Sequence, residues 1–489
     1  MGQRACCGFV LSALIVIGCA EASDGDDEGG TPSTGGTDAT GGNDAGGAEA
    51  GGQGEGGTGG SPPQTSCEPS DGDLVGSECG IFVNPAEGFG GDGSPESPYR
   101  GVAEAIDAAA GQTTTIYVCA GQIEEALTVP ATITLYGGLD CDDDWKWELD
   151  HRTQWTADTG DIPLTIVGAP ALGGGRTIAG FDVVAQNGAV VGESSVAGVV
   201  NGGFVTLERM SFVAGDAVNG QPTMAGQSPN GGDGSVGGDG VGASQQGTGG
   251  ASFCGSVGGN GGSYAAFVAT SGVEGEPNQN NGGPTTASGG DYVCYNGGPG
   301  LPGAAGPDGA DASTLGTIDT SGFHAASGTA GMDGVPGGGG GGGGALFNAA
   351  GGGGGGGGCG GTAGIVGTGG GSSIGLILLD ATVTWSDVRV EVGTAGDGGI
   401  GWSGGAGGIG AGGGQGVSTA CDGGTGGNGG AGGRSGSGAG GHAVGIAYTG
   451  IAPALDGITI VEPSASQAGI GPAAAIDGVA ATTLGFDIE

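Results

Sequence analysis

Positively charged side chains are scarce in this chain of 489 residues. Lys and Arg together number 8 against 51 Asp and Glu, which gives a formal net charge of −43. Nucleic-acid binding depends on Lys and Arg that neutralise phosphates, and attraction to anionic lipid headgroups needs the same charge. The composition therefore excludes nucleic acids and anionic lipid surfaces as partners.

Metal-binding residues and long apolar runs are also few. The chain has 3 His and no Cys-x-x-Cys pair, so the usual spacings of zinc ligands are missing. Beyond the N-terminus, no apolar run reaches the length of about 18 residues that a membrane-spanning helix needs. We predict no cofactor, no metal centre and no transmembrane helix in the body of the protein.

The N-terminus has the features of an export signal. Arg4 precedes the apolar stretch 8–18, which is too short to stay in a bilayer as a helix. The stretch ends in Val16-Ile17-Gly18-Cys19, which resembles a bacterial lipobox. The resemblance implies that residues 1–19 are a lipoprotein signal peptide, and that a lipid on Cys19 attaches the chain to a membrane. Ala20, in place of Asp, favours the outer membrane and the cell surface.

A tether follows the lipobox. Residues 20–66 are mostly Gly, Asp, Ser, Thr and Glu, with very little apolar surface to bury. Such a composition predicts a disordered acidic spacer. The composition changes near Cys67, and residues 67–218 are predicted to hold an N-terminal cap and the first coils of a folded body.

Short apolar runs in this first part predict strands at 81–83, 116–118, 127–129 and 133–136, and helical spacing predicts one helix over 102–110. The run IYVCAGQIEEALTVPATITLYGG resembles the first coil of pectin-lyase-like right-handed parallel β-helices. The resemblance implies an all-β fold, and specifically a right-handed parallel β-helix, or solenoid.

An internal repeat supports a stacked architecture. Residues 195–213 align without gaps to residues from Ser373 onward, at an offset of 373 − 195 = 178. Residues from Ile374 align to those from Val444 at 444 − 374 = 70, and a further copy from Val167 aligns to Val444 at 444 − 167 = 277. Each copy alternates apolar and polar residues, as a strand with one buried face does. The copies predict β-helix coils at 372–395 and 442–489.

Two glycine-dominated insertions, 219–371 and 396–441, separate the copies and hold most of the 134 glycines. Both insertions leave the repeat at the same place, one after Val213 and the other after Val392. Because consecutive coils stack directly, we expect the two insertions to lie side by side on one edge of the solenoid.

Gly-Gly-x triplets in the insertions fit polyglycine-II helices, in which two bare backbones per turn face neighbouring chains. A disordered loop is the alternative, because glycine loses the most backbone entropy on ordering. A calcium-binding β-roll and a collagen triple helix are excluded, since neither sequence period is kept. The composition resembles that of PE-PGRS proteins, although the PE domain is absent.

Eight cysteines follow Cys19 in the exported part of the chain, and an even number in an oxidising compartment predicts disulfides. The eight are Cys67, Cys79, Cys119, Cys141, Cys254, Cys294, Cys359 and Cys421. Cys67–Cys79 and Cys119–Cys141 are the local pairings. Cys359 and Cys421 are expected to link the two insertions. The sequence leaves the full set of pairings open.

An active site is not apparent in the repeats. A lyase needs a basic residue beside the acidic sugar, and a glycosidase needs two carboxylates on one face. Arg209 and Arg389 do not stack, since 389 − 178 = 211, and no Arg or Lys is expected among Asp residues of adjacent strands. Three acidic residues, Asp182, Asp387 and Asp456, are interpreted as corner residues.

Two further groups are weighed as possible sites. His442 is interpreted as structural or solvent-facing rather than catalytic. The acidic cluster contains Asp140, Asp142, Asp143 and Asp144. Its carboxylates offer the oxygen ligands that calcium prefers, but a solvated acidic turn is the favoured interpretation, and the choice stays open.

The sequence as a whole predicts a lipid-anchored structural or adhesive protein that displays its insertions at the cell surface, with no catalytic residues. Extracellular polysaccharide or other surface proteins are the expected partners. The alternative is a polysaccharide-active β-helix enzyme, either a lyase or a glycosidase.

Overall fold

The computed structural model describes residues 65–86, 90–169, 176–277, 281–288 and 291–487. The signal peptide, Cys19 and nearly all of the tether lie outside these residues. The chain divides into residues 1–61 and 62–489, and everything described belongs to the second unit. Strands account for 30% of the structure and helices for 3%, so the fold is all-β with parallel sheets. Within the described residues, no helix is long and apolar enough to cross a membrane.

The N-terminal part contains the one α-helix among the described residues and the first eight strands. They are β1 (Ile81–Val83), α1 (Val102–Ala109), β2 (Thr114–Cys119), β3 (Gly121–Glu124), β4 (Leu127–Val129), β5 (Ile133–Asp140), β6 (Lys146–Trp147), β7 (Thr153–Thr156) and β8 (Leu164–Val167). These bounds confirm the predicted helix and the four predicted strands. Val102, Ala105 and Ala109 of α1 are buried at helical spacing, and the helix ends at Ala110 in the left-handed region.

The long repeat strands follow. They are β9 (Arg176–Ala179), β10 (Phe181–Val184), β11 (Ser195–Asn201), β12 (Phe204–Val213), β19 (Ser373–Leu379), β20 (Thr382–Glu391), β21 (Ala443–Thr449), β22 (Ile458–Ile460) and β23 (Ala480–Phe486), with a short 3₁₀ turn η2 (Ala465–Gln467). Three small hairpins lie inside the first insertion: β13 (Tyr264–Ala265) with β14 (Val268–Ala269), β15 (Thr285–Ser288) with β16 (Asp291–Cys294), and β17 (Thr317–Asp319) with β18 (Gly322–His324).

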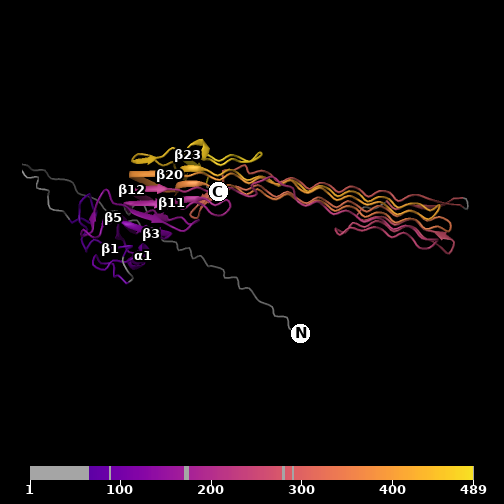
Figure 1. The fold of residues 1–489 in the computed structure, drawn as a ribbon, viewed down its shortest axis with the longest axis horizontal. Coiled ribbons are helices and arrows are strands. Elements are labelled where there is room, and N and C mark those ends of the chain that lie inside the picture. The colour runs from indigo at the N-terminus through magenta and orange to yellow at the C-terminus, as the bar shows by residue number, and fades with distance from the viewer. Residues whose placement is uncertain (1–64, 87–89, 170–175, 278–280, 289–290, 488–489) are drawn as a thin grey trace, which may run out of the picture. The chain divides into compact units, whose positions relative to one another are not determined.

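These strands form two large, mainly parallel sheets. One sheet has eleven strands, including β9, β10, β12, β20 and β22, and the other has six in the order β23-β21-β19-β11-β8-β4. From β10 onward the body strands alternate between the sheets, and Figure 1 shows β11, β12, β20 and β23 stacked beside one another. Apart from the β5–β6 pair, the pairings within the two large sheets are parallel.

The strand register matches the sequence repeat. Ser195 pairs with Ser373, and Phe204 pairs with Thr382, each 178 positions away. The offset of 70 also holds, because Ile374 pairs with Val444. Each copy therefore occupies one level of the stack.

The offset of 277 is correct for only part of its copy. Val183 is level with Ile460 through Phe212 and Val390, and 460 − 183 = 277. Thr165, however, is level with Ala447 through β11 and β19, and 447 − 165 = 282. The connection between β8 and β9 is longer than the corresponding connection in the later copy, so an alignment without gaps cannot hold across both sheets.

Buried side chains fill the space between the sheets. Ile178 and Leu207 lie at successive levels of one column, Val183 and Phe212 lie at successive levels of another, and all four are fully buried. Strand β12 changes direction at Arg209 and β20 at Asp387, where both residues have positive φ values of 49° and 52°. Gly180 and Gly457 have positive φ at the equivalent levels. These residues with positive φ values lie at the same position of successive levels, and the backbone of each level bends there.

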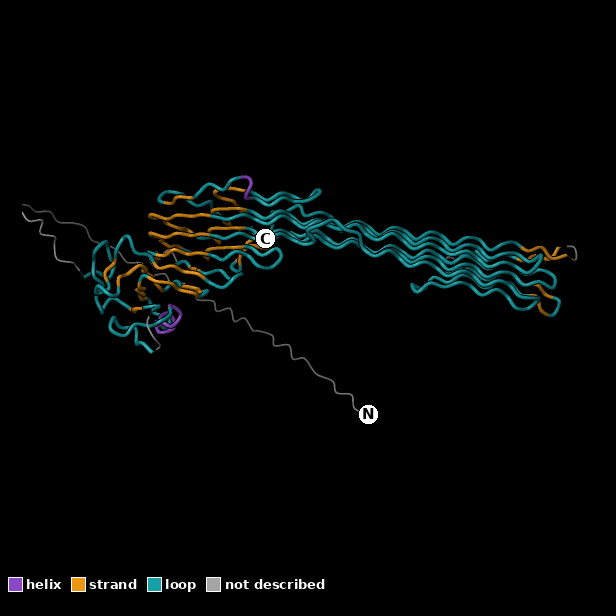
Figure 2. The backbone as a smooth tube through the Cα atoms, in the orientation of Figure 1, coloured by secondary structure: helices purple, strands orange, loops and turns teal. Residues whose placement is uncertain are grey.

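The glycine-rich insertions form extended legs, drawn in teal beyond the strands in Figure 2. Six long legs cover 214–242, 295–312, 326–345, 350–372, 392–417 and 421–442. Backbone hydrogen bonds join neighbouring legs at every third residue. Gly355, Gly358 and Gly361, for example, donate to the carbonyls of residues 424, 427 and 430 at 2.9 Å. This spacing is the three-residue turn of an extended helix.

The two insertions lie side by side, which confirms the expectation from their shared exit point. Gly231 donates to the carbonyl of Ala406 at 2.8 Å, and Gly234 donates to that of Ile409 at 2.9 Å. The first leg of insertion 1 therefore runs parallel to the first leg of insertion 2. The register of the strands continues into the glycine-rich segments.

The number of glycines per triplet follows the number of neighbouring legs. In the run 351–358, an added Cβ would meet backbone oxygens of three different segments, as Gly353, Gly354 and Gly355 show with Thr248, Gly340 and Ala411. The leg 421–442 keeps two glycines per triplet, and the leg 295–312 keeps one. Interior legs therefore need glycine at every position, whereas outer legs tolerate side chains that face solvent.

Four cysteine pairs lie at disulfide distance. Cys67 pairs with Cys79 and Cys119 pairs with Cys141, as the two local pairings require. The expected Cys359–Cys421 pair is wrong. Cys359 instead pairs with Cys254 within insertion 1, and Cys421 pairs with Cys294, which joins the two insertions. The Cα–Cα distances are 5.7 and 5.9 Å.

Candidate functional site

A buried arginine, Arg209, holds together one polar region of the body. Arg209, in the bend of β12, is only 3% exposed, and its guanidinium carbon lies 4.1 Å from the centroid of the Trp147 ring. Its Nη2 donates to the carbonyl oxygens of Glu148, Leu149 and His151 at 2.8, 2.8 and 3.0 Å. Burial lowers the pKa of Arg209 below its ordinary value, and Arg152 nearby adds to that effect. Arg209 thus fixes the loop between β6 and β7.

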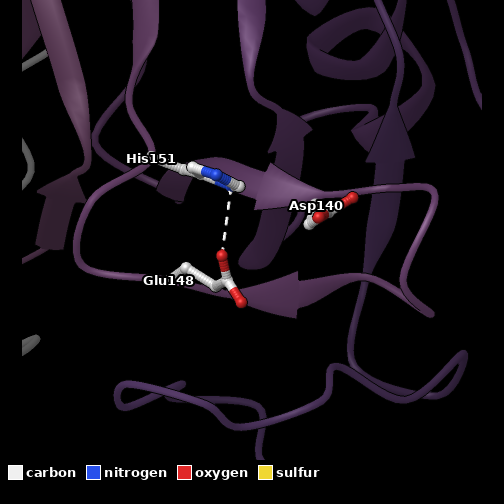
Figure 3. Close-up of side chains that lie close together, drawn as sticks. All are labelled: Asp140, Glu148 and His151. Atoms are coloured by element: carbon white, nitrogen blue, oxygen red, sulfur yellow. Dashed lines mark ion pairs between the residues drawn. The ribbon is translucent and has the colours of Figure 1, made fainter.

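This loop brings three possible metal ligands together, as Figure 3 shows. Asp140, at the end of β5, lies near Glu148 and His151, and one ligand atom from each residue falls within 4.8 Å of the others. Glu148 Oε2 is 3.5 Å from His151 Nδ1. Two carboxylates and an imidazole form a donor set that divalent transition metals accept.

The surrounding charges argue against assigning a metal to the trio. The Lys146 ammonium lies 2.7 Å from Glu148 Oε1, so it already compensates one carboxylate. Asp140 Oδ1 accepts the backbone N–H groups of Asp142 and Asp143 at 3.1 and 3.2 Å, which caps its own turn. Asp140 is the one residue of the sequence-defined acidic cluster that belongs to the trio. Glu148 and His151 were missed because the β5–β6 hairpin and the Arg209 contacts, not sequence proximity, place them.

A second polar cluster places a basic residue between two Asp residues on strands that are separated by β12, an arrangement not predicted from the sequence. Arg152, just before β7, lies between Asp182 of β10 and Asp387 of β20. Its Nη1 is 3.3 Å from Asp182 Oδ1, and its Nη2 is 3.4 Å from Asp387 Oδ2. Arg152 lies outside the aligned repeat copies, so the search of the repeats overlooked it. Arg389 pairs with Ser211 across the strands, and therefore does not stack on Arg209, as predicted.

The two remaining candidates from the sequence, Asp456 and His442, lie in different environments. Asp456 is exposed beside the left-handed Gly457. His442 is fully buried, with Nε2 2.6 Å from the carbonyl oxygen of Leu315 and Nδ1 accepting the N–H of Val479 at 2.9 Å. Because the carbonyl can only accept, Nε2 carries the proton. His442 is a structural residue that ties the first insertion to the C-terminal strands.

The turns that end the legs meet in a second candidate surface, which we name the tip. It comprises the described residues 241–246, 263–270, 284–288 with 291–295, 345–350 and 416–421. Ala350 donates to the carbonyl of Gly242 at 3.0 Å, Val417 donates to that of Ala350 at 2.9 Å, and Tyr264 donates to that of Ala243 at 2.9 Å. The Cys294–Cys421 pair lies at this surface.

Rings gather at the tip. The centroid of Tyr264 is 5.1 Å from that of Phe347 and 6.4 Å from that of Tyr292. The Tyr292 hydroxyl donates to the carbonyl oxygen of Phe267 at 3.0 Å. Three turns that are far apart in sequence therefore share one aromatic patch.

The lipid-attachment residue predicted from sequence, Cys19, lies outside the described residues. Comparison with known proteins gives no match: no family model, no curated protein and no solved structure is significantly similar to the chain.

Proposed function

We propose that this protein is a non-enzymatic, lipid-anchored structural or adhesive protein of the bacterial cell surface. Its strands form a right-handed parallel β-helix, and its glycine-rich legs form a polyglycine-II bundle that projects a contact surface. The observation that carries the proposal is the continuous hydrogen bonding of residues 351–358, where successive N–H groups are bound on three sides. Such a segment serves as a stiff support rather than a flexible linker.

The solenoid part of the proposal draws on three features of the body. The chain alternates between two parallel sheets, the register between levels is constant, and the side chains of successive levels stack in one core. Stacked units of this kind bury a face that no single unit can bury alone.

The legs give the proposed support a useful length. Residues 350–372 run without a turn into β19, and an extended three-fold helix rises about 3.1 Å per residue, which gives about 70 Å. The Cys254–Cys359 and Cys294–Cys421 pairs fix the order of the legs. A long support with a fixed end suits contact with another surface.

The anchor is tested by metabolic labelling with a radioactive fatty acid. We expect label on the wild-type chain and none on the Cys19→Ala variant, because the lipobox cysteine is the acylated residue. Label that persists in the variant, or no label on either protein, contradicts the lipid anchor.

Display is tested separately by an epitope inserted between Ser418 and Thr419, both exposed in the turn of insertion 2. Exposed turns tolerate such insertions. We expect antibody to reach the epitope on intact cells. Detection that requires disruption of the outer membrane contradicts surface display, whatever the fate of Cys19.

A second candidate function, a polysaccharide-active enzyme, is favoured by one observation: Arg152 lies between carboxylates of β10 and β20, the two strands on either side of β12. Both terminal nitrogens of Arg152 are occupied by these ion pairs, which leaves the guanidinium poorly placed to abstract a proton. The test is turnover of uronate oligosaccharides by the purified chain. Turnover that is abolished in Asp182→Ala or Asp387→Ala would overturn the non-enzymatic proposal.

A further inference from the structure

Two phenylalanines are exposed in tight turns of the tip, and one of them has an unfavourable backbone conformation. Phe267 occupies a tight turn between β13 and β14 with φ of 68°, and it is 82% exposed. Phe347 is 64% exposed in a turn whose next residue, Asn348, has φ of 62°. A bulky residue in the left-handed region is unfavourable, and Gly or Asn normally fills such a turn position. Because the Phe267 ring is exposed, packing within the chain does not offset this cost.

The tip is also nearly uncharged. Its five turns contain one acidic residue and no Lys, Arg or His, although the whole chain carries a formal charge of −43. Contact with the tip therefore requires no charge of either sign on the partner. Two carboxylates, those of Asp239 and Asp422, lie on the legs just behind these turns, so an electrically neutral surface fits the tip better than an anionic one.

The two protruding turns are closed by backbone pairing across their bases. Leu346 and Ala349 exchange N–H···O bonds of 2.9 and 3.0 Å, and Tyr264 and Ala265 pair with Ala269 and Val268 across the other turn. Unpaired backbone groups are costly in a medium that lacks water. Pairing across the bases reduces the number of unpaired backbone groups that these two turns would bring into a low-dielectric layer, whereas recognition of a sugar would rely on free polar groups.

The sides of the legs offer less to a partner than the tip does. A partner's backbone could approach the legs closely only at glycines. At nearly all glycines of the described legs, however, an added Cβ would meet a neighbouring segment of this chain. Gly412, which meets nothing within 4 Å, is an exception. The glycine surface is thus already used inside the bundle. The legs expose apolar side chains such as Leu301 and Ile409 along their length, whereas the tip carries two exposed phenylalanines on turns that share one aromatic patch.

We infer that the tip docks onto a zwitterionic lipid bilayer by inserting Phe267 and Phe347 into its interfacial layer. This inference rests on the proposed display function and names the partner of the displayed surface. The exposed Phe267, Phe347 and Val268 provide apolar area, and the exposed Tyr295 carries a hydroxyl suited to the headgroup level. Because the tip lacks basic residues, binding depends on apolar burial and is insensitive to salt.

The test is flotation of the full chain with phosphatidylcholine vesicles, using a Cys19→Ser background so that no acyl chain contributes. We expect binding at low and high salt, with no gain from added anionic lipid. The double variant Phe267→Ser/Phe347→Ser is expected to lower the partition coefficient at least about tenfold. The matched control is Phe253→Ser, because Phe253 is 84% exposed and lies beside Cys254, whose partner Cys359 is about 30 Å along the leg from the tip.

Several outcomes overturn the inference. They are no binding by the parent chain, an equal loss in the Phe253→Ser control, or binding that the double variant retains. Self-association of the parent that the double variant abolishes would identify a second copy as the occupant instead. Retention on insoluble neutral polysaccharide, in the absence of vesicle binding, would identify a glycan. The epitope test of display is independent, so a displayed tip that fails to bind vesicles removes this inference and leaves the proposed function intact.

Discussion

Asp216 and Thr394 lie side by side where the two glycine-rich insertions leave the strands. One carboxylate oxygen of Asp216 accepts both the backbone N–H of Thr394, at 2.7 Å, and its hydroxyl, at 2.8 Å. The two residues are 178 positions apart, which is the offset of the sequence repeat. Asn219 continues the pattern, since its side-chain oxygen accepts the N–H of Asp397 at 2.7 Å. The strand register is thus carried into the legs by Asp and Asn side chains.

The first prediction concerns this junction. Asp216→Ala removes an acceptor of two hydrogen bonds, and we expect the free energy of unfolding to fall by about 1–2 kcal/mol. Asp216→Asn keeps an oxygen acceptor, as Asn219 does, and should lose less. Chemical denaturation of the three proteins checks the order. Equal stability of the wild type and the alanine variant would contradict the proposed role of Asp216.

Acid should weaken the same junction. Hydrogen bonds from Thr394 lower the pKa of Asp216 in the folded protein. The contribution is therefore full above the unfolded value of about 3.9 and is lost as the pH falls through the lower folded value. The stability difference between the wild type and Asp216→Ala should narrow in that acidic range.

The second prediction concerns the interior leg. Gly355→Ala places a Cβ against the carbonyl oxygen of Ala411, where the packed bundle leaves no room, so the free energy of unfolding should fall by about 1–3 kcal/mol or more. Gly412→Ala is the matched control, because its Cβ meets nothing within 4 Å. That variant should be neutral or slightly more stable, since alanine restricts the unfolded chain. Thermal unfolding that ranks the two variants equally would contradict the packing of the legs.

The third prediction concerns the links between cysteines. Peptide mapping without reduction should recover the Cys254–Cys359 and Cys294–Cys421 peptides. The double variant Cys294→Ala/Cys421→Ala should lose about 2–4 kcal/mol, because that link closes a long loop. Recovery of a Cys359–Cys421 peptide would contradict the arrangement of the legs at the tip.

The fourth prediction concerns His442. Burial lowers the pKa of His442, and a proton on Nδ1 would also break the bond from the Val479 N–H. Below about pH 6.5 the unfolded chain therefore binds a proton that the folded chain does not, and stability falls as the pH drops, by up to about 1.4 kcal/mol per pH unit for this group. Urea denaturation at about pH 7.5 and about pH 5.5 should show a larger fall for wild type than for His442→Gln. An identical pH dependence in the two proteins would contradict the assignment.

Much of the fold follows from the sequence because the stacked levels are nearly identical. The offset of 178 between Phe204 and Thr382 is both a sequence alignment and a strand pairing. The helix at 102–109 follows from its apolar spacing. The common exit points after Val213 and Val392 were enough to place the two insertions together.

Other features depend on which legs become neighbours, and periodicity does not encode that. Gly-Gly-x triplets indicate that a leg has neighbours, but they do not say which leg faces Cys359 or Cys421. Arg152, Glu148 and His151 were overlooked for a related reason. They lie in connections between repeat strands, where contacts with Arg209 and with residues of other levels fix their positions.

Amide hydrogen exchange across residues 351–358 tests the central claim most directly. The structure gives every N–H in this run an acceptor in a neighbouring segment, among them the Ser256 hydroxyl for Gly357. We expect exchange far slower than in a free glycine peptide, to a degree similar to the strands β11 and β19. Exchange at the rate of an unstructured peptide would show that the legs do not form a stable bundle, and the proposed rigid support would then fail.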